Sequence, residues 1–119
     1  MENSETLEIA RFFLGRDVEI VIDRPFGSKH PVHGFVYKVN YGYADGVKAP
    51  DGDNLDAYYL GCDKPLNKAR GKVIAIVHRL DDDDGKLVVV AEGFYPADDE
   101  ISRAIYFQER WFEHEIMRD

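Results

Sequence analysis

The chain has 119 residues, with 23 acidic and 15 basic side chains and a formal net charge of −8 at pH 7. This length suits one domain over residues 1–119, and the excess of negative charge argues against binding to nucleic acids and to anionic membranes. A single cysteine, Cys62, excludes an internal disulfide, and no apolar run is long enough to span a membrane.

The first part of the chain predicts a helix and then a strand. Residues 1–5 are acidic and polar, unlike a secretion signal, so we expect a cytoplasmic protein. Apolar side chains recur at helical spacing over 4–14, and Gly15 is suited to end that helix. Alternation over 18–23 predicts a strand, which the Arg24-Pro25 dipeptide ends.

Four further strands and a last helix follow. The strands are expected over 34–43, 55–60, 72–80 and 86–91, and the helix over 101–118 with Trp111 in its apolar stripe. Turns rather than crossover helices separate the strands, so their pairing should be mostly antiparallel. Five short strands with a helix at each end predict an α+β fold that is mainly β, built as a small closed barrel.

The segment Asp51-Gly52-Asp53-Asn54-Leu55-Asp56 holds three carboxylates within six residues. Strand alternation places Asp56 on one face with Tyr58 and Leu60, while Asp51 and Asp53 lie on the turn before the strand. Carboxylates held close together repel one another unless a cation neutralises them, and oxygen ligands suit Mg²⁺, Mn²⁺ or Ca²⁺. Acidic residues also favour simple solvated turns, so the motif by itself leaves both interpretations open.

A second motif precedes the acidic turn. Asn40-Tyr41-Gly42-Tyr43, followed after a short loop by Asp51 to Ala57, resembles the signature region of the soluble, family I inorganic pyrophosphatases. The similarity runs from about residue 18 to residue 91. It implies an OB-type five-stranded antiparallel barrel, a cytoplasmic homo-oligomer, and hydrolysis of diphosphate to two phosphates with Mg²⁺ or Mn²⁺ as the cofactor.

The resemblance also assigns roles to residues of the signature. Asp51, Asp53 and Asp56 match three metal-binding carboxylates. Of these, Asp53 matches the group that accepts a proton from the attacking water, and Asp56 matches the carboxylate that bridges two metals. Tyr41 and Tyr37 match tyrosines of the catalytic and substrate site.

The turn before the last predicted strand carries the remaining matches. Asp84-Gly85-Lys86-Leu87 resembles the family's Asp-x-Lys-Leu, and this resemblance implies that Asp84 is a metal ligand and Lys86 a phosphate ligand. Asp81 or Asp82 resembles the other acidic ligand of that loop. Cleavage of diphosphate also needs cations that hold the leaving phosphate, and Lys29 and Lys38 are further candidates.

The chain departs from the family at several positions. Asn54 replaces Pro or Glu of the signature, and a Lys-x-Glu strand has no clear counterpart near Lys29, His30 and His33. Trp111-Phe112 stand where the family uses a Tyr-Lys pair on phosphate. These departures keep open a second hypothesis. In it the chain is a barrel with weak catalytic activity that binds a metal and a phosphate ligand, or a protein partner.

Overall fold

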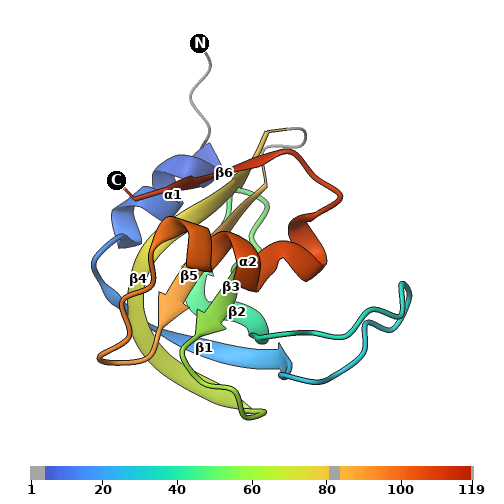
Figure 1. Ribbon diagram of the computed structural model, residues 1–119. Helices are drawn as coiled ribbons and strands as arrows, with labels where there is room; N and C mark the ends of the chain where they lie inside the picture. Colours follow the sequence, from blue (N-terminus) through green and yellow to red (C-terminus); the bar gives the residue numbers. More distant parts are fainter. Residues whose placement is uncertain (1–4, 81–83, 119) are drawn as a thin grey trace.

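This computed structural model describes residues 5–80 and 84–118, and within them the chain forms six strands and two helices (Figure 1). Neither helix is long and apolar enough to cross a membrane. The elements are, in chain order, α1 (Glu5–Phe13), β1 (Asp17–Arg24), β2 (Asn40–Lys48), β3 (Asn54–Leu60), β4 (Lys68–Arg79), β5 (Gly85–Val90), α2 (Asp98–Glu109) and β6 (His114–Met117).

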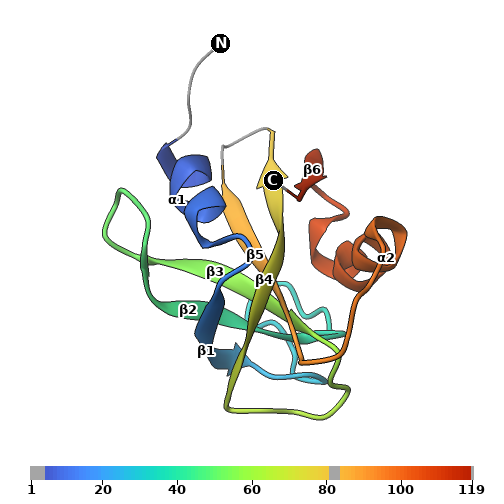
Figure 2. The same cartoon turned by 90° about the vertical axis from the view of Figure 1, so that its left-hand side faces the viewer.

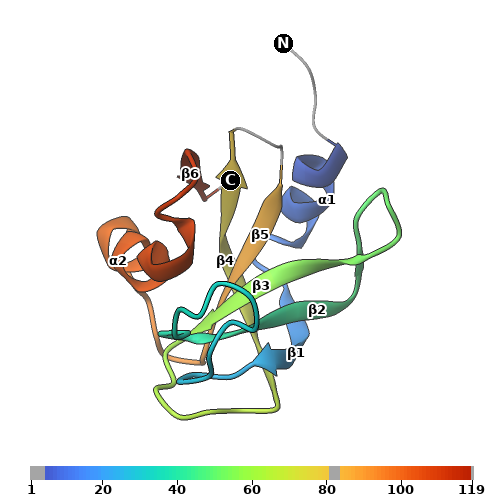
Figure 3. The ribbon, with the colours of Figure 1, turned by 90° about the vertical axis from the view of Figure 1, so that its right-hand side faces the viewer.

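The first five strands close into the expected barrel. Their order is β1-β2-β3-β5-β4, and β1 also pairs with β4, so the sheet returns to its own start. Pairing is antiparallel except between β3 and β5, which run parallel. The two helices flank the barrel on opposite sides (Figure 2), and the hairpin that joins β2 and β3 reaches toward α1 (Figure 3). The prediction of a mainly β barrel with an N-terminal and a C-terminal helix is therefore confirmed.

The side chains of β3 alternate between two faces, as predicted, and the structure adds that each face packs in a core of its own. Leu55, Ala57 and Tyr59 join a cluster to which all five barrel strands contribute, with Ala10 of α1 at its edge. Tyr58 lies on the other face of β3, in a second cluster with side chains of β4, β5 and α2. Asp56 shares the face of Tyr58, so the strand holds its carboxylate outside the first core.

The strand expected over 34–43 is wrong in its first half. Residues 25–39 form a loop in which Lys29 and Val36 make a single bridge, and β2 starts only at Asn40 and continues to Lys48. The side chain of Asn40 explains the starting point. It is buried, accepts hydrogen bonds from the backbone N–H groups of Phe26 (3.0 Å) and Leu66 (3.1 Å), and joins three segments of the chain.

The helix expected to reach residue 118 ends at Glu109 instead, and a sixth strand follows. Residues 114–117 pair antiparallel with β4, with Ile116 opposite Val77. The backbone N–H of Phe112 turns back to the carbonyl of Glu109 at 3.0 Å, which directs the chain toward β4. Trp111 lies on this turn and is 55% exposed, so its predicted place in the core is wrong.

Candidate functional site

An acidic cleft of about 450 Å³ lies between the β2–β3 hairpin, α1 and the start of β5. Its lining includes four carboxylates that the sequence singled out: Asp51, Asp53, Asp56 and Asp84. The turn that carries the first two is held by a hydrogen bond from the Asp53 N–H to Asp51 Oδ1 at 3.0 Å. Gly52 has a φ of +91°, a conformation that glycine adopts without strain.

The Asn-Tyr-Gly-Tyr motif places β2 tightly against β1. A Cβ atom on Gly42 would lie 1.8 Å from the carbonyl oxygen of Val21, so a side chain there would push the two strands apart. The glycine allows this close pairing of β1 with the strand that carries Tyr41. The close packing of β1 and β2 therefore explains the glycine of this motif, which the sequence alone did not explain.

The carboxylates of the cleft suit a hard divalent cation by their chemistry, since all their ligand atoms are oxygen. Within residues 5–80 and 84–118, however, no three acidic, histidine or cysteine side chains converge closely enough to hold an ion. The expected meeting of these carboxylates at one point is therefore not seen among the described residues. Asp56 and Asp84 turn toward a lysine instead, and Asp81 and Asp82 lie outside the described residues.

That lysine is Lys86, which is 3% exposed and stands at the centre of the site. Its Nζ donates hydrogen bonds to Tyr41 Oη at 2.7 Å and to Asp56 Oδ2 at 2.9 Å, and lies 3.2 Å from Asp84 Oδ2. The parallel register of β3 and β5 pairs Ala57 with Leu87, which sets Asp56 beside Lys86. Side chains from β2, from β3 and from the residue before β5 therefore contact one ammonium group.

The charge states of this cluster follow from its contacts. Burial alone would lower the pKa of Lys86, but the oxygens of Tyr41, Asp56 and Asp84 raise that pKa above the ordinary lysine value. Burial raises the pKa of Tyr41 far above the ordinary tyrosine value, and the Lys86 charge opposes that rise. At neutral pH the site thus holds an ammonium group and a protonated phenol side by side.

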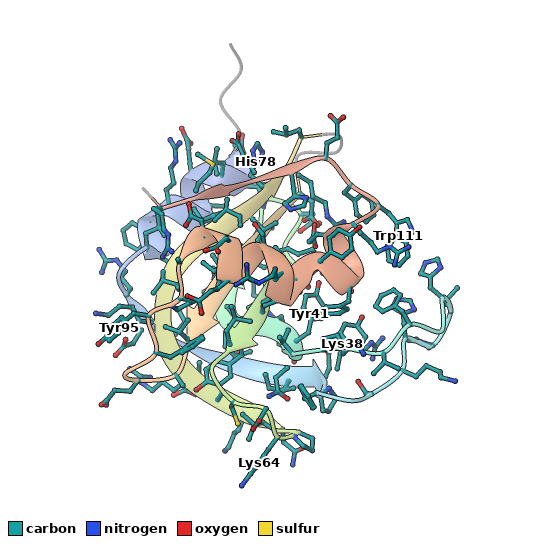
Figure 4. All side chains as sticks on the ribbon, in the orientation of Figure 1. Lys38, Tyr41, Lys64, His78, Tyr95 and Trp111 are labelled. Atoms are coloured by element: carbon teal, nitrogen blue, oxygen red, sulfur yellow. The ribbon has the colours of Figure 1, made fainter. Side chains whose placement is uncertain are left out.

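A second cavity of about 500 Å³ shares Lys86 and Tyr41 with this cluster. Its other lining residues come from the 25–39 loop, β4, the end of α2 and the turn after that helix: His30, His33, Phe35, Arg79, Gln108, Trp111 and Phe112. Figure 4 shows Trp111 beyond the C-terminal end of α2, with Lys38 on the loop below it. Lys86 therefore lines the aromatic cavity and contacts two carboxylates of the acidic cleft, Asp56 and Asp84.

Arg79, which lines the cavity, forms a buried ion pair with Glu109, and the sequence prediction missed this pair. Two parallel hydrogen bonds join them, from Nε to Oε1 at 2.9 Å and from Nη2 to Oε2 at 3.0 Å. The Tyr58 hydroxyl also donates to Glu109 at 2.5 Å, and the guanidinium lies 3.7 Å from the Phe112 ring centroid. Burial alone would raise the pKa of Glu109, but the hydrogen bonds from Arg79 and Tyr58 lower it.

A signal for this pair was present in the sequence. Ile101, Ile105 and Glu109 recur every four residues, so the glutamate lies on the apolar stripe of α2. A carboxylate on such a stripe needs a buried cationic partner, and Arg79 at the end of an apolar strand was available.

The other predicted substrate-binding residues lie on the loop formed by residues 25–39. Tyr37 is buried on the 25–39 loop, not on a strand, and its ring stacks on Tyr41 with centroids 5.5 Å apart. Burial raises the pKa of Tyr37, and the neighbouring Arg24 opposes the rise. Lys29 and Lys38 are exposed on the same loop and are not among the lining residues of either space.

Comparison with known proteins gives matches in structure only. No protein-family model and no curated protein matches the chain. The inorganic pyrophosphatase from Ehrlichia chaffeensis superposes with a TM-score of 0.67 at 15% identity, over 99% of this chain and 88% of that one. Those from Helicobacter pylori and Neisseria gonorrhoeae give TM-scores of 0.66 and 0.61 at 13% and 21% identity. They match 87% and 78% of this chain, and 85% and 72% of their own. The chain therefore has the fold of the inorganic pyrophosphatases.

Proposed function

We propose that this protein hydrolyses inorganic diphosphate to two phosphates with a divalent metal ion, Mg²⁺ or Mn²⁺. The observation that carries the proposal is the buried Lys86 ammonium, which contacts Asp56, Asp84 and Tyr41 at the border of an acidic cleft. The fold shared with inorganic pyrophosphatases supports the same reaction class. We also propose a cytoplasmic homo-oligomer, as the resemblance implies.

The carboxylates of the acidic cleft are the groups that would hold the metal. They are Asp51, Asp53, Asp56 and Asp84, and Asp81 or Asp82 is the further ligand that the resemblance implies. A bound divalent cation supplies charge neutralisation at the phosphoryl oxygens and brings the pKa of water within reach of neutral pH. The oxygen-only donor set favours Mg²⁺ or Mn²⁺ over softer metals.

The protein's own side chains would perform the other steps of the reaction. Lys86 and Tyr41 present an ammonium and a hydroxyl that stabilise charge developing on the leaving phosphate, and their burial fixes them before substrate arrives. Asp53 is exposed on the rim of the cleft, where its carboxylate accepts the proton of the attacking water. Tyr37 supports the Tyr41 ring, and Lys29 is the loop cation proposed to contact phosphate.

The direct test is a phosphate-release assay on the purified full chain with diphosphate and Mg²⁺, Mn²⁺ or a chelator. We expect turnover of diphosphate that requires the metal and is absent in the chelator. Size-exclusion chromatography with light scattering on the same sample tests the homo-oligomer. Lack of phosphate release with either metal, in protein that is folded and binds Mg²⁺ by calorimetry, would contradict the enzymatic proposal.

That outcome would favour the second candidate, a barrel that binds a metal and a phosphate ligand or a protein partner. One observation favours it: the ammonium and the guanidinium among the described cavity residues are already paired. Lys86 contacts Asp56 and Asp84, while Arg79 contacts Glu109. Such a barrel would bind diphosphate in the calorimeter and release no phosphate.

A further inference from the structure

The cavity beside the acidic cleft is walled mainly by rings. Phe35 lies between Trp111, with centroids 5.5 Å apart, and His30, with centroids 4.8 Å apart. Trp111 borders the space and is 55% exposed. The volume of about 500 Å³ lies within the range of small-molecule sites. This wall suits a flat organic group better than a bare inorganic anion.

The ionic groups of the cavity also favour an organic ligand over a bare inorganic anion. The Lys86 charge is balanced by Asp56 and Asp84, and the Arg79 charge by Glu109. A bare diphosphate in the cavity would therefore meet little uncompensated positive charge from these two cations. A ligand that places only one end of its phosphate chain at Lys86 brings fewer phosphate charges close to these compensated cations.

His30, on one side of this wall, is uncharged at neutral pH. His30 Nδ1 accepts hydrogen bonds from the backbone N–H groups of Val32 at 3.1 Å and His33 at 3.0 Å, which leaves the ring proton on Nε2. Loss of hydration lowers the pKa of His30, and the charges of His33 and Arg24 lower it further. A neutral ring with an N–H at its outer edge can stack on a base or donate to it.

We propose that the aromatic cavity binds the base of a nucleoside polyphosphate, whose phosphoanhydride passes Lys86 into the acidic cleft. The inference rests on the proposed function for its chemistry and names the substrate class of the same site. In the reaction with a nucleoside diphosphate, water oxygen bonds to the β-phosphorus and its proton passes to Asp53. The bond from the β-phosphorus to the bridging oxygen breaks, and that oxygen leaves with its electron pair as part of the nucleoside monophosphate.

Binding can be tested without turnover by a matched pair of ligands. Adenosine 5′-(α,β-methylene)diphosphate carries the base, and methylenediphosphonate is the same non-hydrolysable phosphate mimic without it. We expect calorimetry with Mg²⁺ to give at least about tenfold tighter binding of the adenosine compound, in line with stacking of a base on aromatic side chains. Trp111 is the only tryptophan, so its fluorescence should change with that compound and not with methylenediphosphonate.

Two variants localise the effect. Trp111→Ala should lower the preference for the adenosine compound by about tenfold. Tyr95→Ala removes another exposed aromatic ring, 81% exposed and outside the cavity, and should keep the preference. Equal affinity for the two ligands, or a preference that survives Trp111→Ala, would overturn the inference. Burial of Trp111 by a second copy of the chain, with fluorescence that depends on protein concentration and not on nucleotide, would also overturn it.

The two proposals fail in different ways. Diphosphate hydrolysis without any preference for the adenosine compound removes the base site and leaves the proposed function intact. Selective binding of the adenosine compound without phosphate release from diphosphate or ADP supports the base site and contradicts the hydrolytic function.

Discussion

Lys86 and Asp56 lie side by side on the parallel strands β5 and β3, with the ammonium nitrogen 2.9 Å from Oδ2. The lysine is almost fully buried, while the aspartate side chain is open to the acidic cleft. One buried cation thus faces the carboxylates that would hold a metal ion. It both fixes their orientation and competes with the metal for their charge.

Lys86→Met tests these two roles, because it keeps the length of the side chain and removes its charge. We expect kcat/KM for diphosphate to fall by about 10²–10³, the effect of losing one preorganised donor. Mg²⁺ should bind more tightly, because Asp56 and Asp84 lose their competing cation. Phosphate release and calorimetry measure the two quantities. A loss of both activity and Mg²⁺ affinity would mean that Lys86 mainly maintains the shape of the cleft.

Asp56→Asn removes one carboxylate charge and keeps the size of the side chain. We expect diphosphate turnover to fall by orders of magnitude, with a small change in melting temperature because Lys86 keeps Asp84 and Tyr41. The control is Asp63→Asn, on an exposed residue of the β3–β4 connection that lines neither space. Equal losses in the two variants would show that the site is wrongly placed.

Mg²⁺ should stabilise the folded protein, since an ion that binds only the native state shifts the unfolding equilibrium. At about 100 times its Kd the gain is about 2.7 kcal/mol. The melting temperature should therefore rise with Mg²⁺ in the wild type, and less in Asp51→Asn and Asp53→Asn. Scanning calorimetry at matched ionic strength, with Na⁺ replacing Mg²⁺, checks this. An equal rise in all three proteins would place the bound ion elsewhere.

The Arg79–Glu109 pair should be the most sensitive point of the fold outside the apolar cores. Glu109 is 0% exposed, so Glu109→Gln leaves a guanidinium poorly compensated in the interior and should cost about 3–5 kcal/mol in unfolding free energy. The double variant Arg79→Met with Glu109→Gln should lose less than the sum of the two single changes, because no uncompensated guanidinium remains. Urea unfolding at pH 7 measures all four proteins. Additive losses would show that the two side chains act independently.

The same glutamate predicts an acid dependence of stability. Its pKa is lower in the folded than in the unfolded chain, so its ionised form favours folding. This contribution is fully present above the ordinary glutamate pKa and is lost as the pH falls through the lower, folded value. Urea unfolding from pH 7 down to pH 3 should therefore show a steep loss below the ordinary glutamate pKa. Glu109→Gln should be less stable at pH 7 but lose less between pH 5 and pH 3.

Local pattern accounts for what the sequence predicted correctly. Alternation along 55–60 assigned Leu55 and Tyr58 to opposite faces, and both faces are buried against the cores that this requires. The helical spacing before Gly15 predicted α1, and the glycine indeed has a φ of +81° after the helix. The carboxylate spacing before β3 likewise placed Asp51 and Asp53 on a turn that enters the strand. Each of these features depends on residues within a few positions of one another.

Long-range contacts determine the features of the fold and the site that the sequence did not predict. The buried amide of Asn40 bonds to backbone groups 14 and 26 residues away and so determines where β2 begins. Residues 114–117 are extended because β4 offers them backbone partners, although helical spacing continued past Glu109. The sequence by itself therefore determined which segments are amphipathic and where the acidic turn lies. The tertiary structure alone placed Lys86 against Asp56 and Arg79 against Glu109, because 30 positions separate the partners of each pair and no local periodicity records that contact.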